Sequence, residues 1–523
     1  MSYTSFSYLL FFLGITYVLY TLFPKKCKYI VLLCMSYLFY IVSSSWLVVF
    51  IVLTTFIIYF SAIWIDKINS IFIDVKKSLN RDEKKDLKNK LLWQKKAVVC
   101  VMLFFCLGAL VFLKYYNLFS EILNFVIFQH IHLELPYLKL LLPLGISFYT
   151  LQAISYVIDV YRGKYKADYC LPRVALYLVF FPTIVEGPIG RYDEYAYQLY
   201  EGHSFHYENL TFGCQLILWG LFKKLVIADR ANLFVNVVFK SSQDYAGFAV
   251  IFSIIFYTIQ IYTEFSGCMD IVRGSAQIFS VHLPQNFKQP FFSKSINEFW
   301  QRWHMTLGTW LRDYVFYSVS LSQPFKKFNQ LVKNHCNGYL SKLLPATTAL
   351  FFVWICNGLW HGASIKYIVY GMYYYVLMVL GMFLEPVFIK VMKTFHIHKE
   401  TQFFRVFQII RTCILVNIGM LIFRAKDLTT AWNMFLSCFR DFSLQPLSSY
   451  GLRLSDLLMI VCGVVIVFIV GVLKEKGVSI RETIAKRNIV LRWTVYFAAL
   501  FIVIIFGAYG RGYDAVSFIY AQF

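Results

Sequence analysis

The sequence predicts an all-α, polytopic integral membrane protein. Hydrophobic residues make up 59% of its 523 residues. Only 15% are charged, against about 25% in ordinary soluble domains. The apolar residues are gathered in runs long enough to cross a bilayer as helices. No internal repeat or long Gly/Ser linker separates domains, so we expect residues 1–523 to form a single membrane domain.

The charge and cysteine content exclude two other classes of protein. A net charge of +22 would suit a nucleic-acid-binding protein if the basic residues were gathered on one soluble module. They are instead scattered between the apolar runs, which indicates positive-inside loops and no nucleic-acid partner. The 12 cysteines include no CxxC pair and lie mostly inside apolar runs, so they predict neither a disulfide framework nor a zinc site.

The basic residues near the N-terminus predict an orientation. The first apolar run, residues 6–23, is followed by three lysines within residues 25–28. This order predicts an extracytoplasmic N-terminus and a cytoplasmic first loop. Two further runs within residues 29–65 return the chain to the same side, where residues 66–96 carry ten Lys or Arg against five acids. We therefore expect 66–96 to be a charged cytoplasmic loop of a multi-pass protein of the inner, cytoplasmic membrane, surrounded by membrane lipids.

The middle of the chain contains interrupted apolar segments. Residues 97–113 predict a fourth span, whereas 115–132 suit either an interfacial helix or another crossing. Residues 141–164 are apolar but broken by proline and glycine, and residues 181–192 repeat this character around Glu186. Broken helices occur at membrane depth only where protein or a wet cavity covers them, so we expect these segments to be buried.

The C-terminal half predicts several further spans. They are residues 245–262, 344–360, 365–384, 404–423, 457–473 and 493–507. Together with the N-terminal runs they give about 11 or 12 transmembrane helices plus re-entrant helices.

The segment 284–316 holds the densest cluster of polar groups. Ser295, followed three residues later by Glu298, forms a capping box that predicts a helix starting at Ile296. Four apolar residues then recur at three- and four-residue steps, as one helix face: Trp300, Trp303, Leu307 and Trp310. Glu298 lies one turn before Arg302, the favourable order for an ion pair. Because so many charges do not face lipid, we expect a re-entrant or protein-buried helix.

Two histidines are the strongest functional candidates. His304 lies within the polar segment, and His361 ends an apolar run in which Asn357 precedes it by one turn. An imidazole can act as a base at neutral pH. The alternative for His361 is a neutral core histidine at a helix end. Ionisable groups inside membranes are costly and usually functional, which favours a functional role.

Several motifs resemble one enzyme family. FWQRWHMTL, NGLWHG, FPTIVEGPIGRY and GLFKKLVIAD are similar to segments of the membrane-bound O-acyltransferase family, in its bacterial branch that acetylates alginate and peptidoglycan and is related to the teichoic acid D-alanyl transfer protein. The resemblance implies a helical bundle with re-entrant helices around a central tunnel. It also implies that His361 is catalytic and that His304 is the second characteristic histidine. The chain departs from the family pattern at Glu264, at Cys268 and in residues 318–328.

The resemblance also implies an activity. An acyl group, in this branch acetyl, would pass from a cytoplasmic thioester such as acetyl-CoA across the membrane to hydroxyls of an extracytoplasmic polysaccharide or cell-wall glycan, the acceptor. An exported serine esterase-like partner would finish the transfer. The thioester is a substrate, and no bound cofactor is expected. His361 would take the hydroxyl proton or carry the acyl group, while His304 would position the thioester or polarise its carbonyl.

Other side chains have candidate supporting roles. Asn357 could orient the His361 ring or donate to the developing oxyanion. Trp300, Trp303 and Trp360 could line the substrate path, although packing is the competing interpretation, and Asp313 could gate access. The two HxH pairs, at residues 130–132 and 396–398, lack matching ligands, so no metal site is expected.

Two other functions remain open. A transporter or flippase of lipid-linked sugars would also explain broken helices and a buried Glu186 and Asp159. It should keep moving its cargo when His361 is replaced, whereas an acyltransferase should lose transfer. A D-alanyl or lipid acyltransferase of the same fold would differ in the acyl group that it accepts.

Overall fold

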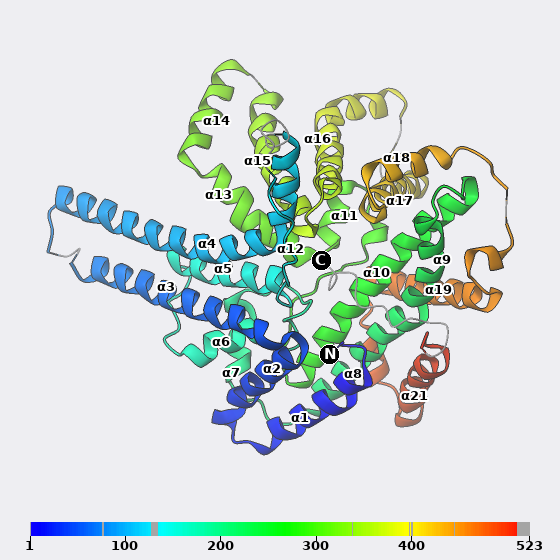
Figure 1. Cartoon of the computed structure of the whole chain (residues 1–523), viewed down its shortest axis with the longest axis horizontal. Helices are drawn as coiled ribbons and strands as arrows, with labels where there is room; N and C mark the ends of the chain where they lie inside the picture. The colour runs from blue at the N-terminus through cyan, green and yellow to red at the C-terminus, as the bar shows by residue number, and fades with distance from the viewer. Residues whose placement is uncertain are drawn as a thin grey trace. The chain divides into compact units, whose positions relative to one another are not determined.

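We describe the fold from a computed structural model (Figure 1). The structure describes residues 2–75, 78–126, 134–336, 338–396, 398, 401–443 and 445–509. The chain divides into two compact units. Unit 1 comprises Met1–Cys214 and Val272–Pro284, and unit 2 comprises Gln215–Ile271 and Gln285–Phe523. The prediction of one membrane domain stays a prediction.

The described residues form helices and a single isolated β-bridge. Nine helical stretches in this part of the chain are long and apolar enough to cross a membrane. One of them, Lys25–Val75, contains two successive helices, and a shorter apolar helix covers Ser7–Leu22. The predicted all-α, polytopic membrane architecture is therefore confirmed. The total of 11 or 12 crossings and the orientation of the N-terminus stay predictions.

Unit 1 contains the N-terminal helices. They are η1 (Ser7–Phe12), α1 (Leu13–Leu22), η2 (Lys25–Cys27), α2 (Lys28–Ser44), η3 (Ser45–Leu47), α3 (Val48–Val75), α4 (Arg81–Val126), α5 (Ile146–Arg162), α6 (Leu171–Val179), η5 (Tyr192–Ala196), α7 (Tyr197–Tyr200) and the start of α8 (Tyr207–Leu221).

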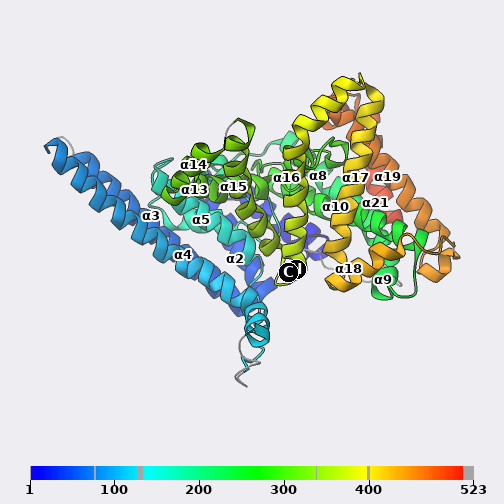
Figure 2. The same cartoon turned by 90° about the horizontal axis from the view of Figure 1, so that it is seen from above.

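The charged segment 66–96 is mostly helical, and its place as a cytoplasmic loop between two spans stays a prediction. α3 continues to Val75 and α4 begins at Arg81. Figure 1 and Figure 2 show the two helices side by side as a long hairpin. The segment is rich in lysine and leucine, which favour helix even where little packs against them. The Glu83 carboxylate accepts a hydrogen bond from the Asn80 N–H at 2.9 Å.

α4 also settles part of the region 115–132. The helix continues without a break through Val126, so residues 115–126 extend the fourth span, while residues 127–133 lie outside the described part.

A glycine just before α5 lets two backbone segments approach closely. Gly145 has φ 69°, and a Cβ at this position would overlap the carbonyl oxygen of Ile184 in the broken segment 181–192. Most side chains of α5 and of residues 181–191 are buried, as predicted, whereas Leu141 and Leu142 at the start of the first segment are exposed.

Unit 2 contains the remaining elements. They are the end of α8, η6 (Phe222–Ala228), α9 (Asp229–Lys240), α10 (Gly247–Ile278, to Ile271), η7 (Pro290–Phe292), α11 (Ile296–Arg302), α12 (Met305–Leu311), η8 (Arg312–Phe316), α13 (Tyr317–Ser320), α14 (Gln323–His335), α15 (Tyr339–His361), α16 (Ile365–Thr394), α17 (Gln402–Arg424), α18 (Leu428–Ser437), η9 (Leu447–Tyr450), α19 (Leu454–Glu475), α20 (Ile480–Ala485) and α21 (Ile489–Phe506).

Small residues bring α15 and α16 into close contact. A Cβ on Gly358 would overlap the carbonyl oxygen of Tyr367, and a Cβ on Gly371 would overlap that of Trp354. Glycines at such crossings let two backbones approach closely, which is a common way to pack helices in membranes. The contact fixes the end of α15, where His361 lies.

Unit 2 also buries a network of charges on η6, α9 and α10. The Lys224 ammonium lies 2.7 Å from the Asp229 carboxylate and 3.1 Å from that of Glu264. The neighbouring Lys223 lies 2.7 Å from Asp270. Buried lysines of this kind are stable only when acids pair with them, so these ion pairs join the helices of unit 2.

Candidate active site

The start of the predicted polar helix is confirmed. The Ser295 Oγ accepts a hydrogen bond from the Glu298 N–H at 3.1 Å. The Glu298 carboxylate in turn accepts from the Lys294 N–H at 2.8 Å. Glu298 and Arg302 form the expected ion pair at 2.8 Å. These contacts cap the first turn of α11 and hold its last residue.

The predicted continuous helix is broken between α11 and α12, so that prediction was wrong. Trp303 is extended, with φ −109° and ψ 128°, and forms an antiparallel bridge with Phe287. His304 follows in the left-handed region, with φ 47° and ψ 51°. The aromatic residues of α11 and α12 therefore do not share one helix face. Pairing with a distant segment has overridden the local helical pattern.

The backbone around His304 is held in place on both sides of the break. The Lys288 N–H donates to the carbonyl oxygen of Arg302 at 2.9 Å, and the Met305 N–H donates to that of Asn286 at 3.0 Å. A left-handed conformation costs a non-glycine residue about 1–3 kcal/mol and is concentrated at functional sites. The two bonds supply the constraint that such a conformation needs.

The Asn286 side chain is the polar partner of His304. Its Oδ1 accepts from the Thr306 N–H at 3.0 Å and from the Thr306 hydroxyl at 2.9 Å, and it lies 3.3 Å from Nδ1 of His304. Its Nδ2 donates to the Met269 sulfur at 3.2 Å. Asn286 is 1% exposed, so this amide is a fixed part of the interior.

Two aromatic rings pack against the His304 ring. Phe265 lies edge-to-face with it at a centroid separation of 4.9 Å, and Trp360 does so at 5.2 Å. His304 is 2% exposed and lies outside the nine candidate spans. Burial in this apolar setting disfavours the charged form and lowers the pKa of His304 to about 3. The ring is therefore neutral at physiological pH.

His361 is equally buried at the end of α15, with 2% exposure. Its ring meets three aromatic rings edge-to-face, at centroid separations of 5.0 Å for Trp360, 5.6 Å for Tyr370 and 5.2 Å for Phe423. These rings come from α15, α16 and α17. The His361 imidazole therefore lies in a largely aromatic environment.

Trp360 joins the two predicted histidines. The same indole contacts the ring of His304 and the ring of His361. Asn357, one turn before His361, is 5% exposed, and its Oδ1 accepts no hydrogen bond within the described part of the chain. A buried amide oxygen of this kind is available to a hydrogen-bond donor on a bound molecule. The catalytic role of the histidines and the orienting role of Asn357 stay predictions.

The other predicted site residues lie in two different surroundings. Trp300 contacts Trp354 at 5.1 Å and Tyr374 at 4.9 Å, beside the rings that surround His361. Trp303 packs between Phe287 and Phe299, at 5.1 and 5.4 Å, which favours the packing interpretation for this residue.

Asp313 lies at a more exposed position on η8. Its carboxylate accepts from Nε of the adjacent Arg312 at 3.0 Å. The side chain is about one third exposed. A gating role for Asp313 stays a prediction.

The sequence interpretation missed three residues of this site. Asn286 lies in the irregular segment between two prolines, and no local pattern connected it with His304. Tyr370 and Phe423 belong to apolar helices in which aromatic residues are frequent. The only usable signal was the polar Asn286 itself, since an amide close to a buried helix is expected to find a partner.

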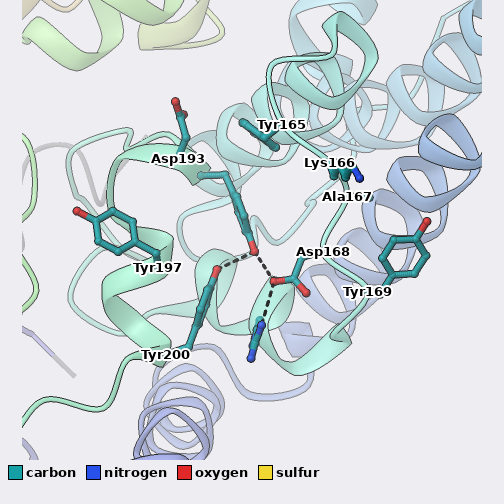
Figure 3. Close-up of a pocket in the computed structure, with 10 residues that line it drawn as sticks. Tyr165, Lys166, Ala167, Asp168, Tyr169, Asp193, Tyr197 and Tyr200 are labelled. Atoms are coloured by element: carbon teal, nitrogen blue, oxygen red, sulfur yellow. Dashed lines mark hydrogen bonds and ion pairs between the residues drawn. The ribbon is translucent and has the colours of Figure 1, made fainter. Parts of the chain in front are cut away.

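A separate cavity of about 400 Å³ lies in unit 1 (Figure 3). Its lining is rich in tyrosine: Tyr165, Tyr169, Tyr192, Tyr197 and Tyr200. The Tyr200 hydroxyl donates to that of Tyr192, which donates to Asp168, each at 2.7 Å. Burial is the largest cause that raises the pKa of Tyr192 and of Tyr200, so both stay protonated. None of the predicted site residues is among the described residues that line this cavity.

Comparison with known proteins identifies a family and several relatives to which the chain is similar. Residues 165–332 match the model of the family described as MBOAT, membrane-bound O-acyltransferase family. This range contains Asn286 and His304, whereas His361 lies beyond it. The chain is similar to a probable alginate O-acetylase of Azotobacter vinelandii, with 30% identity over 366 residues, covering 69% of this chain and 67% of that protein.

Two further relatives show similar levels of identity. A probable alginate O-acetylase of Pseudomonas aeruginosa is 32% identical over 329 residues, covering 63% of this chain and 57% of that protein. A peptidoglycan O-acetyltransferase of Helicobacter pylori is 28% identical over 346 residues, covering 61% and 60% respectively. The chain thus spans about 57% of the length of the Pseudomonas relative.

Proposed function

The chain belongs to the membrane-bound O-acyltransferase family, and we propose that it transfers an acetyl group from a cytoplasmic thioester, such as acetyl-CoA, to hydroxyls of an extracytoplasmic polysaccharide or cell-wall glycan, directly or through a partner protein. Relatives named as O-acetylases of alginate and an O-acetyltransferase of peptidoglycan support the choice of acetyl. The observation that carries the proposal is that two buried histidines, His304 and His361, both contact the indole of Trp360.

The proposed reaction needs a base for the hydroxyl proton. As the hydroxyl oxygen attacks the thioester carbonyl, its O–H bond breaks and the proton passes to an unprotonated imidazole nitrogen. The new C–O bond forms, the C–S bond breaks, and the thiolate leaves with a proton returned by the imidazolium. General-base help of this kind is typically worth about 10²–10⁴ in rate.

We assign the base to His361 and place the thioester carbonyl beside it. The ring is 2% exposed and surrounded by aromatic side chains, and a dry setting strengthens interactions with the charge that develops during reaction. The buried Oδ1 of Asn357 would accept a hydrogen bond from the acceptor hydroxyl or from the donor's amide groups.

A second protein would complete the pathway. The family resemblance implies an exported serine esterase-like partner that receives the acetyl group and passes it to the glycan. The thioester acts as a substrate in this scheme.

The test compares ester-linked groups on surface glycans by mass analysis, in cells with the intact gene, without it, and with substituted genes. We expect His361→Ala and His361→Gln to lower the amount of ester-linked acetyl on the glycans by about 10²-fold or more. The variant proteins should remain in the membrane at a normal level. His335→Ala, in the exposed last turn of α14, is the matched control and should keep the ester.

Two results would overturn the proposal. One is an ester content that does not change when the gene is removed. The other is a His361→Gln protein that is folded and transfers acetyl at the normal rate. Continued movement of a lipid-linked sugar by that variant, with no ester on the glycan in any strain, would favour the transporter instead.

A further inference from the structure

The hydrogen bonds around Asn286 determine which way its amide faces. The backbone N–H of Thr306 donates to the atom assigned as Oδ1, at 3.0 Å. A backbone N–H is always a donor. An amide nitrogen placed there would bring two donors together, so the oxygen must occupy this position. The orientation of Asn286 therefore follows from the backbone and does not depend on the histidine.

The fixed oxygen then determines the tautomer of His304. Nδ1 of His304 lies 3.3 Å from Oδ1 of Asn286. Oδ1 can only accept, so Nδ1 must carry the hydrogen. In a neutral imidazole one nitrogen is protonated and the other is not, which leaves a lone pair on Nε2.

The surroundings keep the ring neutral. Phe265 on α10 and Trp360 on α15 face it, and desolvation is the cause that lowers the pKa of His304. The acids of α10 nearest in sequence, Glu264 and Asp270, are paired with lysines of η6. On α15 the titratable group nearest in sequence to Trp360 is His361, whose ring contacts the same indole.

We propose that Asn286 is a positioning residue that holds His304 as the Nδ1–H tautomer, so that Nε2 presents a lone pair and accepts, rather than donates, a hydrogen bond during acyl transfer. The inference rests on the proposed function. It changes the role expected for His304 from the resemblance, because an unprotonated Nε2 does not polarise a thioester carbonyl. It suits a group that accepts a hydrogen bond from the acceptor hydroxyl and so orients it, while His361 takes the proton.

The direct test is ¹⁵N NMR of the full-length protein labelled at histidine, with the His304 signals assigned by their loss in His304→Gln. We expect wild-type Nε2 to show the shift of an unprotonated nitrogen, unchanged between pH 8 and pH 5. A protonated Nε2 in wild type would overturn the proposal whatever the activity. This readout does not depend on acyl transfer, so it separates failure of the tautomer from failure of the proposed function.

Two substitutions of Asn286 extend the test. Asn286→Leu removes the acceptor, so we expect loss of the single-tautomer spectrum and a fall in kcat of about 10- to 100-fold with a smaller change in KM. Asn286→Asp restores an acceptor of the same shape. Its charge should favour the imidazolium and raise the pKa of His304 by about 1–3 units, so the acid limb of the rate profile should move to higher pH.

Thr306→Val is the matched control. It removes the second hydrogen bond to Oδ1 of Asn286 but keeps the backbone N–H that fixes the amide. We expect its His304 spectrum to remain that of the Nδ1–H tautomer. An Asn286→Leu protein with the wild-type spectrum and rate profile would overturn the proposal, because the tautomer would then be held by something else.

Discussion

Trp360 and His361 are neighbours at the end of α15 with ring centroids 5.0 Å apart, and the same indole meets His304 at 5.2 Å. The indole therefore packs against both histidines. A structural change in Trp360 should reach both rings at once. This relationship gives the site a test that leaves both histidines in place.

We predict that Trp360→Phe lowers kcat for acetyl transfer by about 10- to 100-fold, because displacements near 1 Å cost a reaction about this much. The measurement is the rate of transfer from acetyl-CoA in membranes. Trp354→Phe is the control, since this tryptophan is also buried in α15 but its ring contacts are with Trp300 and Tyr374. Equal losses in the two variants would show that the effect comes from general loosening of α15.

The sequence predicted the helices that depend on long apolar runs, because an 18-residue run specifies a span by itself. Residues 66–96 are predicted as a charged loop between spans, and most of their backbone is helix, in α3 and α4, as their many lysines and leucines favour. Polarity predicted exposure correctly there but said nothing about backbone conformation.

The site was predictable only in its residue types. His304 and His361 could be selected because ionisable groups are rare in such apolar surroundings. The break at His304 could not be predicted, since it depends on the bridge between Trp303 and Phe287. The contact with Asn286 has the same origin. Eighteen residues separate the two side chains, and only folding brings them together.

We predict that Gly145→Ala destabilises the protein by about 3 kcal/mol, the sum of a left-handed conformation and a forced backbone shift. Gly145 has φ 69°, and an added Cβ would overlap the carbonyl oxygen of Ile184. Gly163→Ala is the control because Gly163 has φ 75° with nothing within 4 Å of the added Cβ. It should cost only about 1 kcal/mol. Thermal unfolding in detergent checks both, and equal shifts would contradict the prediction.

We predict that Lys224→Met destabilises the protein by about 3–5 kcal/mol, because the carboxylates of Asp229 and Glu264 would lose the ammonium that lies between them. The variant that also carries Asp229→Asn and Glu264→Gln should regain part of this loss. Lys333→Met, at an exposed position of α14, should change stability by less than about 0.5 kcal/mol. A Lys224→Met protein as stable as the Lys333→Met protein would mean that the buried ion pairs contribute little to the free energy of unfolding.

We predict that His304 makes the protein less stable as the pH falls below about 6.5, the ordinary pKa of histidine. Burial lowers the pKa of His304 to about 3. Between these two values the unfolded chain binds a proton that the folded protein does not, so the free energy of unfolding decreases with decreasing pH by about 1.4 kcal/mol per unit.

The comparison is between wild type and His304→Gln, whose other titrating groups are the same. At pH 5 the wild type should have lost about 2 kcal/mol more than the variant, relative to pH 7.5. Thermal unfolding across this range measures the difference. Parallel curves would mean that His304 is protonated in the folded protein, which would also remove the reason to assign Nε2 a lone pair at acidic pH.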